Sequence, residues 1–339
     1  MQKKVIHWCL WVFVLFCLLL GSAIFALSVG SVGIPLKKIL VVIFKSKGTT
    51  EYSILFDIRL PRILLGFAVG GSLSLAGVIL QGMFRNPLVE PYTLGISGGA
   101  ALGVCLNIVL RLSLVFSIIT LPVSGFLGAI LVILLVYSLS IKRGILKIQG
   151  FLLTGVMISF ISTSLIMLIM AVSRQEDLHG IVFWIMGSLE EPSWLLIKLI
   201  SLVSILGLII SYRFCFALNA FSLGEEEAMH LGIDTEKSKR LLFVLASLLT
   251  GCSVSVAGMI GFVGLVVPHF MRMFLGGDYR ILLVSSFISG GAFLIFCDTL
   301  ARIAISPLEL PVGVITGILG GLLFVYALGK REVVLGEKI

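Results

Sequence analysis

"ILLGFAVGGSLSLAGVILQGMF", residues Ile63–Phe84, contains no Asp, Glu, Lys or Arg. A helix that crosses a bilayer needs about 20 mainly apolar residues, because each residue adds about 1.5 Å to its length. This run therefore predicts a membrane-spanning helix. Glycine, alanine and serine recur along it, and such small residues let helices approach closely within a membrane.

Similar uncharged runs recur along the 339 residues, of which 59% are hydrophobic and only 12% are charged. About a quarter of the residues of a soluble protein are charged, and a soluble chain could not bury so many apolar segments. We therefore predict an all-α polytopic membrane protein, with one transmembrane domain over residues 1–339. The other runs are Trp8–Val29, Leu94–Leu110, Leu112–Ile141, Ile148–Ser173, Ile281–Cys297 and Leu310–Gly329, with Ser193–Tyr212 interrupted only by Lys198.

One further run, Leu241–Met271, is too long for a single crossing. It would form a helix of about 47 Å, whereas the hydrocarbon core of a bilayer is about 30 Å thick. Gly258 and Gly261 lie near its middle and predict a turn, so one full helix should return through a short one. The first run is too long for a secretion signal and is expected to stay as a membrane helix. The total is about ten crossings.

Loop charges predict the orientation. With both termini in the cytoplasm, fifteen of the 25 basic residues fall on the cytoplasmic side and ten fall outside. Cytoplasmic loops usually carry the excess of Lys and Arg, so this orientation is favoured. The loop Gly30–Arg62 is an exception, since it holds six of the outside charges. Headgroup snorkelling accounts for its lysines.

Two stretches resemble each other at matching spacing. "GSLSLAGVILQGMFRNP" ends at Pro87 and "CSVSVAGMIGFVGLVVP" ends at Pro268, and "ISGGA" occurs at both Ile96 and Ile288. In the ten-helix plan the first two stretches run in opposite directions, which is typical of the inverted repeats of transporters. Shared helix-packing residues are the alternative explanation.

The chain shows no energy source of its own. An ion-driven carrier usually keeps ionisable groups inside the membrane, but Asp298 lies toward a helix end with Arg302 four residues later, which favours a local ion pair. The Walker A pattern of nucleotide-binding loops is absent from the sequence. We therefore expect a partner to supply the energy, and no cofactor on this chain.

A short acidic stretch, "SLGEEEAMHLGID", follows the sixth predicted helix and faces the cytoplasm in this plan. Ser222 followed by Glu225 is a capping-box pattern, and Gly232 is a typical helix end. Ala228, Met229 and Leu231 give the predicted helix an apolar side. Such a short helix is marginal alone, so it should pack against something, and a nucleotide-hydrolysing subunit is the natural partner.

Four motifs together resemble the FecCD-type permeases, which are the membrane subunits of ABC importers for ferric siderophores, haem and vitamin B12. They are "RLPRILLGFAVGGSLSLAGVILQGMFRNPLVEPYTLGISGGA" (Arg59–Ala100), "SLGEEEAMHLGI" (Ser222–Ile233), "GFVGLVVPHFMR" (Gly261–Arg272) and "DTLARIAISPLELPVGVITGILGG" (Asp298–Gly321). The resemblance covers nearly the whole chain except the first helix and the loop after it.

The resemblance implies a vitamin B12 permease-like fold in a bacterial or archaeal cytoplasmic membrane. It implies a second permease subunit, two cytoplasmic ATPases that hold ATP and Mg²⁺, and an external substrate-binding protein; no nucleic-acid partner is expected. The cytoplasmic coupling helices correspond to about residues 216–233. The residues implied for the ATPase contact are Leu218, Asn219, Ser222, Leu223, Gly224, Glu225, Glu226, Glu227, Ala228, Leu231 and Gly232.

The same resemblance implies two further sites. Arg59, Arg62 and Arg302 match positions that receive acidic residues of the binding protein, through exposed ion pairs that steer docking more than they hold the complex. The conduit is expected between two permease subunits, along the fifth and tenth helices. The residues implied for it are Thr154, Met157, Ser159, Gly313, Gly317 and Gly321, although tight helix packing also explains the glycines.

Two alternative functions stay open from the sequence. Gly95–Gly99 matches the G-x-S-x-G pattern of serine hydrolases, but the four histidines are expected near helix ends or in loops. A stand-alone ion-driven carrier needs only the inverted repeat. The cargo is expected to be a metal chelate, with ferric siderophore first and haem or cobalamin next. No cluster with metal-ligand spacing is seen for a bare ion.

Overall fold

Long helices make up nearly the whole of the computed structural model, which describes residues 2–30, 32–45, 48–116, 119–142, 145–146, 148–190, 193–306 and 308–336. The long helices are α1 (Gln2–Ser28), α4 (Leu60–Phe84), α7 (Thr120–Ser140), α8 (Ile148–Val172), α10 (Trp194–Arg213), α13 (Thr235–Ala257), α15 (Tyr279–Ile303) and α16 (Val312–Gly336). Lys47, Arg143, Lys147 and Lys338, which count among the loop charges, lie outside the described residues.

Shorter elements connect these helices. They are α2 (Leu36–Lys45), α3 (Thr50–Ser53), the π-helix η1 (Ile54–Arg59), the 3₁₀ turn η2 (Pro91–Leu94), α5 (Ile96–Val109), α6 (Leu112–Phe116), α9 (Gln175–Met186), α11 (Cys215–Leu223), α12 (Glu225–His230) and α14 (Val263–Leu275). Two short strands, β1 (Ile141–Lys142) and β2 (Ile145–Leu146), pair antiparallel with Ile141 opposite Leu146.

The predicted all-α membrane fold is confirmed. Seven helices of the described chain are long and apolar enough to cross a bilayer, and α5, α14 and the apolar part of α16 are shorter apolar helices. These segments correspond to the ten predicted crossings. The overlong run divides as expected, because α13 ends at Ala257, Gly258 turns the chain at φ +70°, and α14 begins at Val263. The run Leu112–Ile141 differs, since it divides into α6 and α7.

Helix α4 is the buried axis of the fold. It packs against α10, α13, α14 and α15. Of the most apolar 18-residue stretch of the segment Thr50–Phe84, 89% is buried inside the protein. Glycines allow the closest crossings: a Cβ on Gly70 would overlap the carbonyl oxygen of Gly290 on α15, and a Cβ on Gly77 would overlap that of Gly264 on α14. Small residues thus bring backbones into direct contact, as in other membrane helix bundles.

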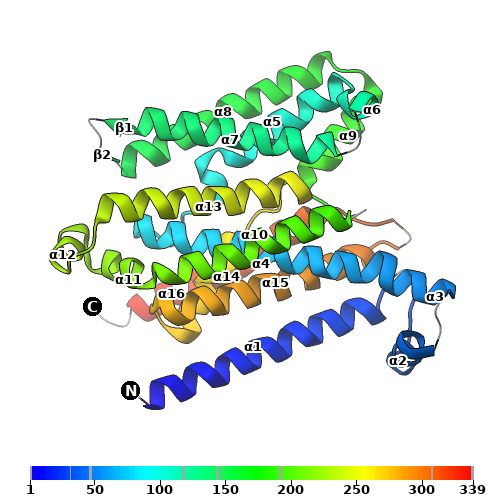
Figure 1. Ribbon diagram of the computed structural model, residues 1–339, viewed down its shortest axis with the longest axis horizontal. Helices are drawn as coiled ribbons and strands as arrows, with labels where there is room; N and C mark the ends of the chain where they lie inside the picture. The colour runs from blue at the N-terminus through cyan, green and yellow to red at the C-terminus, as the bar shows by residue number, and fades with distance from the viewer. Residues whose placement is uncertain are drawn as a thin grey trace.

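The elements gather at two opposite ends of the molecule (Figure 1). One end carries α11, α12, the two short strands and both marked chain termini, and we call it the α12 end. The other carries α2, α3 and α6, and we call it the α2 end. Helices α5, α7 and α8 form a group on one side of α13 (Figure 1).

The two resembling stretches lie on helices of opposite direction. Helix α4 runs toward the α12 end, whereas α13 leaves α12 and runs away from it (Figure 1). The two "ISGGA" copies differ, because α5 and α15 run in the same direction. Each copy marks a close crossing instead: Gly99 lies against Gly128 of α7, and Gly290 lies against Gly70 of α4. Helix packing therefore explains this second match.

The α4–α14 contact can be tested with Gly77→Ala. The added methyl group meets backbone rather than a movable side chain, so we expect a loss of stability of about 1–3 kcal/mol or more. The thermal unfolding midpoint in detergent measures it. Gly21→Ala on α1, where nothing lies within 4 Å of the added Cβ, is the control. Equal midpoints for the two variants would contradict the packing role of Gly77.

Candidate functional site: an acidic helix pair and a buried arginine cluster

The helix pair α11–α12 lies at the α12 end of the molecule, and Gly224 separates the two helices. Gly224 adopts φ +136° and ψ 160°, a region that is essentially restricted to glycine. The predicted capping box is wrong, since Gly224 rather than Ser222 precedes the first residue of α12. The Ser222 hydroxyl instead donates to the carbonyl oxygen of Asn219 within its own helix, at 2.6 Å.

The predicted end of the acidic helix is confirmed. Gly232 has φ +80°, and its N–H donates to the carbonyl oxygen of Met229 at 2.9 Å. The N–H of Ile233 donates to the carbonyl oxygen of Ala228 at 3.1 Å. This pair of bonds closes the helix end in the manner of a Schellman motif, for which glycine at the left-handed position is favoured.

Some residues implied for the partner contact face inward instead. Leu218 and Ala228 are fully buried. The Asn219 amide donates to Asp278 Oδ1 at 3.3 Å, and its oxygen accepts from the N–H of Tyr279 at 3.1 Å. Asn219 therefore fastens α11 to the start of α15.

Asp278 joins three elements at this end. Its carboxylate pairs with Arg280 at 2.7 Å and with Lys4 of α1 at 3.2 Å, and it accepts from the Asn219 amide. The Arg280 guanidinium beside it, together with Lys4 and Asn219, holds the pKa of Asp278 well below its usual range. The carboxylate therefore stays ionised, and it ties α11 to α1 and α15 at neutral pH.

Glu225 is held by a buried lysine. Lys239 of α13 is only 3% exposed, and its ammonium group contacts the carboxylate of Glu225 and lies 3.9 Å from that of Glu236. A buried charge is costly unless it is paired, so this contact fixes α12 on α13. Glu225 is thus an internal anchor as well as a member of the acidic stretch.

Five other side chains of the pair face outward. Leu223 and Leu231 are more than 60% exposed, and Met229 is 53% exposed. Glu226 and Glu227 are exposed beside them. We call Leu223, Glu226, Glu227, Met229 and Leu231 the coupling surface. Apolar side chains flanked by carboxylates, on a helix pair that is anchored from behind, form a surface suited to a protein partner.

A cluster of buried charges lies toward the α2 end. Arg62 of α4 pairs with Asp298 of α15 at 2.9 Å and with Glu309 at 2.6 Å. Arg302 pairs with the second oxygen of Asp298 at 3.2 Å, which confirms the local ion pair predicted from their spacing. Arg59 donates to the carbonyl oxygens of Leu27 and Val32. The cluster therefore joins α1, α4, α15 and the segment that precedes α16.

The three arginines are less than 10% exposed, so their expected presentation as exposed charges is wrong. Headgroup snorkelling does not describe them either, since two carboxylates and backbone carbonyls of the chain itself receive their guanidinium groups. Glu190, in the loop before α10, borders the cluster. Burial raises the pKa of Glu190; Arg62 opposes this shift, and the neighbouring Glu309 adds to it.

The residues implied for a conduit divide between two helices. On α8, the hydroxyls of Thr154 and Ser159 donate to carbonyls of their own helix, at 2.7 and 3.0 Å, while Met157 is 48% exposed. On α16, Gly313 packs against backbone oxygens of Met186 and Met259. The other two glycines of the stripe, Gly317 and Gly321, border open space or only the edge of the Phe262 ring. Helix α8 packs on α5 and α7, whereas α16 packs on α9, α14 and α15.

Sequence reasoning missed Glu90, which the loop after α4 carries back into the protein. Its carboxylate accepts from the N–H of Phe262 at 2.6 Å, just before the start of α14. Phe262 is left-handed at φ +67°, and the Tyr92 hydroxyl both donates to and accepts from Ile260 at 2.9 Å. Buried ionisable groups inside membrane proteins are often functional, and here the carboxylate caps a helix that begins inside the protein. The sequence places Glu90 in a loop and gives no sign of this return.

No group of three or more His, Cys, Asp or Glu side chains suited to a metal ion occurs in the part of the chain that the structure describes. The carboxylates of the arginine cluster are occupied by guanidinium groups. The chemistry available at the described sites is therefore ionic pairing and helix anchoring.

Similarity to known proteins extends over nearly the whole chain. A sequence model of the FecCD transport family matches residues 17–330. The cobalamin import system permease protein BtuC of Halobacterium salinarum is 38% identical over 284 residues, which are 84% of this chain and 75% of that protein. The hemin transport system permease protein HmuU of Yersinia pestis is 38% identical over 293 residues, which are 85% and 86% of the two chains.

A solved structure has the same fold. It shows an inward-facing conformation of a transporter assigned to the metal-chelate type of ABC transporter, and it is 30% identical to this chain. The match has a TM-score of 0.83 and covers 95% of this chain and 99% of the other.

The arginine cluster can be tested with Asp298→Asn. The change removes the one carboxylate shared by Arg62 and Arg302, and breaking a buried ion pair costs about 3–5 kcal/mol because a charge is left uncompensated. We expect a lower thermal unfolding midpoint in detergent. Asp57→Asn, at an exposed position, is the control. Similar midpoints for the two variants would contradict a stabilising cluster.

Proposed function

Because the chain belongs to the FecCD transport family, we propose that it is the permease subunit of an ATP-binding-cassette importer that takes up a metal chelate. The observation that carries this proposal is the coupling surface on α11–α12. It exposes apolar and acidic side chains together, while residues behind it fasten the pair to the membrane helices. A permease driven by a separate ATPase needs a surface of this kind, on which the ATPase can bind and transmit its conformational change.

The contacts of the helix pair indicate how a movement of the ATPase would be transmitted to the membrane helices. Glu225 joins α12 to α13 through Lys239, and Asn219 joins α11 to the start of α15 through Asp278 and Tyr279. Helix α13 leads directly to the turn at Gly258, beyond which α14 begins. A displacement of α11–α12 by an ATPase would therefore move α13 and α15 together, and the α13–α14 turn with them.

This mechanism places the α12 end in the cytoplasm, with both termini, and the α2 end outside. The basic loop residues favour that orientation. The proposed assembly contains two ATPases, a second permease subunit and a substrate-binding protein at the α2 end. The conduit would lie between the two permease subunits, where Met157 of α8 and the open side of Gly317 on α16 face outward.

The proposed cargo is a metal already enclosed in an organic ligand, and ferric siderophore is the first candidate. Two observations support this class. Two of the relatives are named for cobalamin and hemin, and the described part of the chain has no cluster that would hold a bare ion. Haem and cobalamin are the other candidates. The ligand that copurifies with the partner binding protein would distinguish them.

Reconstitution separates this proposal from an ion-driven carrier. In liposomes that hold the chain with its partner ATPases and loaded binding protein, we expect uptake to require ATP. A proton or sodium gradient should drive no uptake by the chain alone. Gradient-driven uptake without an ATPase would contradict the proposal, and Glu90 would then be the first residue to examine.

The coupling surface can be tested by reversing two exposed charges, with Glu226→Arg and Glu227→Arg together. Like charges placed across an interface cost several kcal/mol, so we expect at least about a tenfold loss of ATP-driven uptake and of ATPase copurification. The matched control is Glu176→Arg with Asp177→Arg, an adjacent acidic pair in α9. Copurification should survive in that control. Normal uptake in the first variant would place the ATPase contact elsewhere.

The docking role of the arginines can be tested with Arg62→Gln and Arg302→Gln. Glu309 is the more exposed of the two carboxylates in the cluster, so a carboxylate of the binding protein would compete with it for Arg62. We expect capture of the loaded binding protein at low salt to weaken by about two- to tenfold, with the difference shrinking at high salt. Unfolding midpoints are measured alongside to separate binding from stability.

Glu309→Gln provides the contrasting variant for docking. It removes the competing carboxylate without touching an arginine, so capture should stay equal or improve. If capture fell as far as in the arginine variants, the cluster would act through the fold and would have no direct contact with the binding protein.

A further inference from the structure

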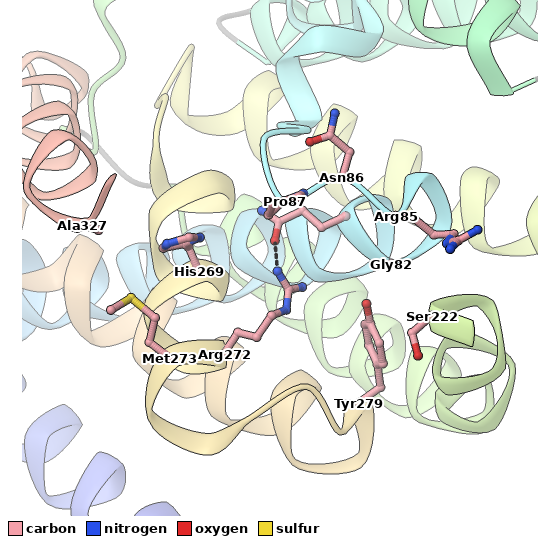
Figure 2. A pocket seen from close by; sticks show the side chains of 11 residues that line it. Gly82, Arg85, Asn86, Pro87, Ser222, His269, Arg272, Met273, Tyr279 and Ala327 are labelled. Carbon is pink, nitrogen blue, oxygen red and sulfur yellow. Dashed lines mark hydrogen bonds between the residues drawn. The ribbon is translucent and has the colours of Figure 1, made fainter. Parts of the chain in front are cut away.

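A cavity of about 610 Å³ opens at the α12 end, between the membrane helices and α11. Its volume falls in the range of sites that bind small molecules. Figure 2 shows the side chains around it, which come from α4 and the loop after it, α11, α14, α15 and α16.

The charge of the lining is one-sided. It includes Arg85, Arg272 and His269 but neither Asp nor Glu. Among the described residues, no ion pair includes Arg85 or Arg272. Arginine donates five N–H groups in a planar fork that matches phosphate, so the cavity favours a phosphate-bearing anion.

Arg272 is held in place by neutral groups. Its guanidinium donates to Gln81 Oε1 at 3.2 Å, and the Gln81 amide donates to the carbonyl oxygens of Gly264 and Leu265 at 3.2 and 3.4 Å. The Tyr279 side chain also hydrogen-bonds to Arg272. Gln81 and Tyr279 thus orient Arg272 without a carboxylate to neutralise it. In Figure 2 the guanidinium lies between His269 and Tyr279, while Arg85 lies nearer Ser222.

Compensation of helix ends explains part of this arrangement. Arg85 follows the last residue of α4, and Arg272 lies in the last turn of α14, where cations interact favourably with the helix dipole. That account explains each arginine alone. It does not explain a shared hollow whose other polar groups include the Asn86 amide and the Tyr279 hydroxyl, which can also donate hydrogen bonds.

The apolar part of the surroundings favours a lipid over a small soluble anion. Met273 and Pro87 line the cavity, and Met273 and its neighbour Phe274 are about half exposed on α14. Phe274 stacks on Trp11 of α1 at 5.7 Å between ring centroids. An amphipathic ligand could place its anionic head at the arginines and its apolar part along this wall. Basic pockets between membrane helices on the cytoplasmic side bind anionic lipid headgroups.

We propose that this cavity binds the headgroup of an anionic phospholipid of the cytoplasmic leaflet, with Arg272 as the phosphate ligand and Arg85 adding positive charge elsewhere on the cavity wall. The proposal rests on the proposed function in one respect, because that function places the α12 end in the cytoplasm. A lipid bound there would join α4 and α14 to α11, which carries part of the coupling surface.

Native mass spectrometry of the full chain, purified and stripped of lipid in detergent, tests the proposal. The chain is titrated with phosphatidylglycerol or with phosphatidylcholine, which share the phosphate but differ in net charge. We expect about a tenfold preference of the wild type for phosphatidylglycerol. Arg85→Gln with Arg272→Gln should abolish the preference, whereas Arg213→Gln, an exposed arginine at the end of α10 outside the cavity, should keep it.

Two results would overturn the proposal: equal binding of both lipids by the wild type, or a loss in the double variant no greater than in Arg213→Gln. If the double variant fails to fold, Arg272→Lys and the exposed Arg85→Gln replace it. The lysine should keep part of the preference, because it keeps the charge but loses the planar fork.

A second titration distinguishes a soluble occupant. Inorganic phosphate is compared with chloride at equal ionic strength, and the unfolding midpoint is measured. A rise caused by phosphate and lost in the double variant, without a lipid preference, would overturn the lipid assignment in favour of a free anion. ATP-driven uptake is measured separately, so failure of the transport proposal and failure of this one give different results.

Discussion

Direct contact between helix backbones is the constraint on which this structure depends. Helix α4 is surrounded by protein, and at Gly70 and Gly77 it touches the backbones of α15 and α14 with no side chain between them. Apolar burial gives little drive for association inside a membrane, so close packing of this kind must supply it. The short helix α14 keeps its position because Gly264 lies against α4.

Polar groups then fix the two ends of this packed core in different ways. Toward the α2 end, Arg62 and Arg302 share the carboxylate of Asp298, Arg62 also pairs with Glu309, and Arg59 donates to a carbonyl of α1. At the α12 end, the polar contacts of Asn219, Asp278 and Lys239 attach the helix pair that carries the coupling surface. In the permease proposal, the binding protein would dock at the α2 end, and the helix pair at the α12 end would pass on the movement of the ATPase.

Hydropathy alone predicted the spans, since lipid demands long apolar helices, and glycine predicted the turn at Gly258 and the end at Gly232. The sequence patterns could not predict which side chains pair when they lie far apart in the chain. Arg62 seemed exposed because Glu309 lies 247 positions away, and Glu90 seemed to belong to a loop because nothing in the sequence reveals its bond to Phe262. The capping box failed because the backbone of Gly224, rather than the hydroxyl of Ser222, decides where α12 begins.

The residues that pack against the glycines of α4 are synthesised late in the chain, and this has a consequence for biosynthesis. Gly264 and Gly290 are made long after Gly70 and Gly77, and a ribosome adding about 5–20 residues per second needs on the order of 10–40 s to reach them. During that interval the glycine faces of the nascent helix lack the partners that cover them in the folded protein. Chains truncated before α14 would never form these contacts. Membrane quality-control proteases could recognise the uncovered glycine faces and degrade the truncated chains.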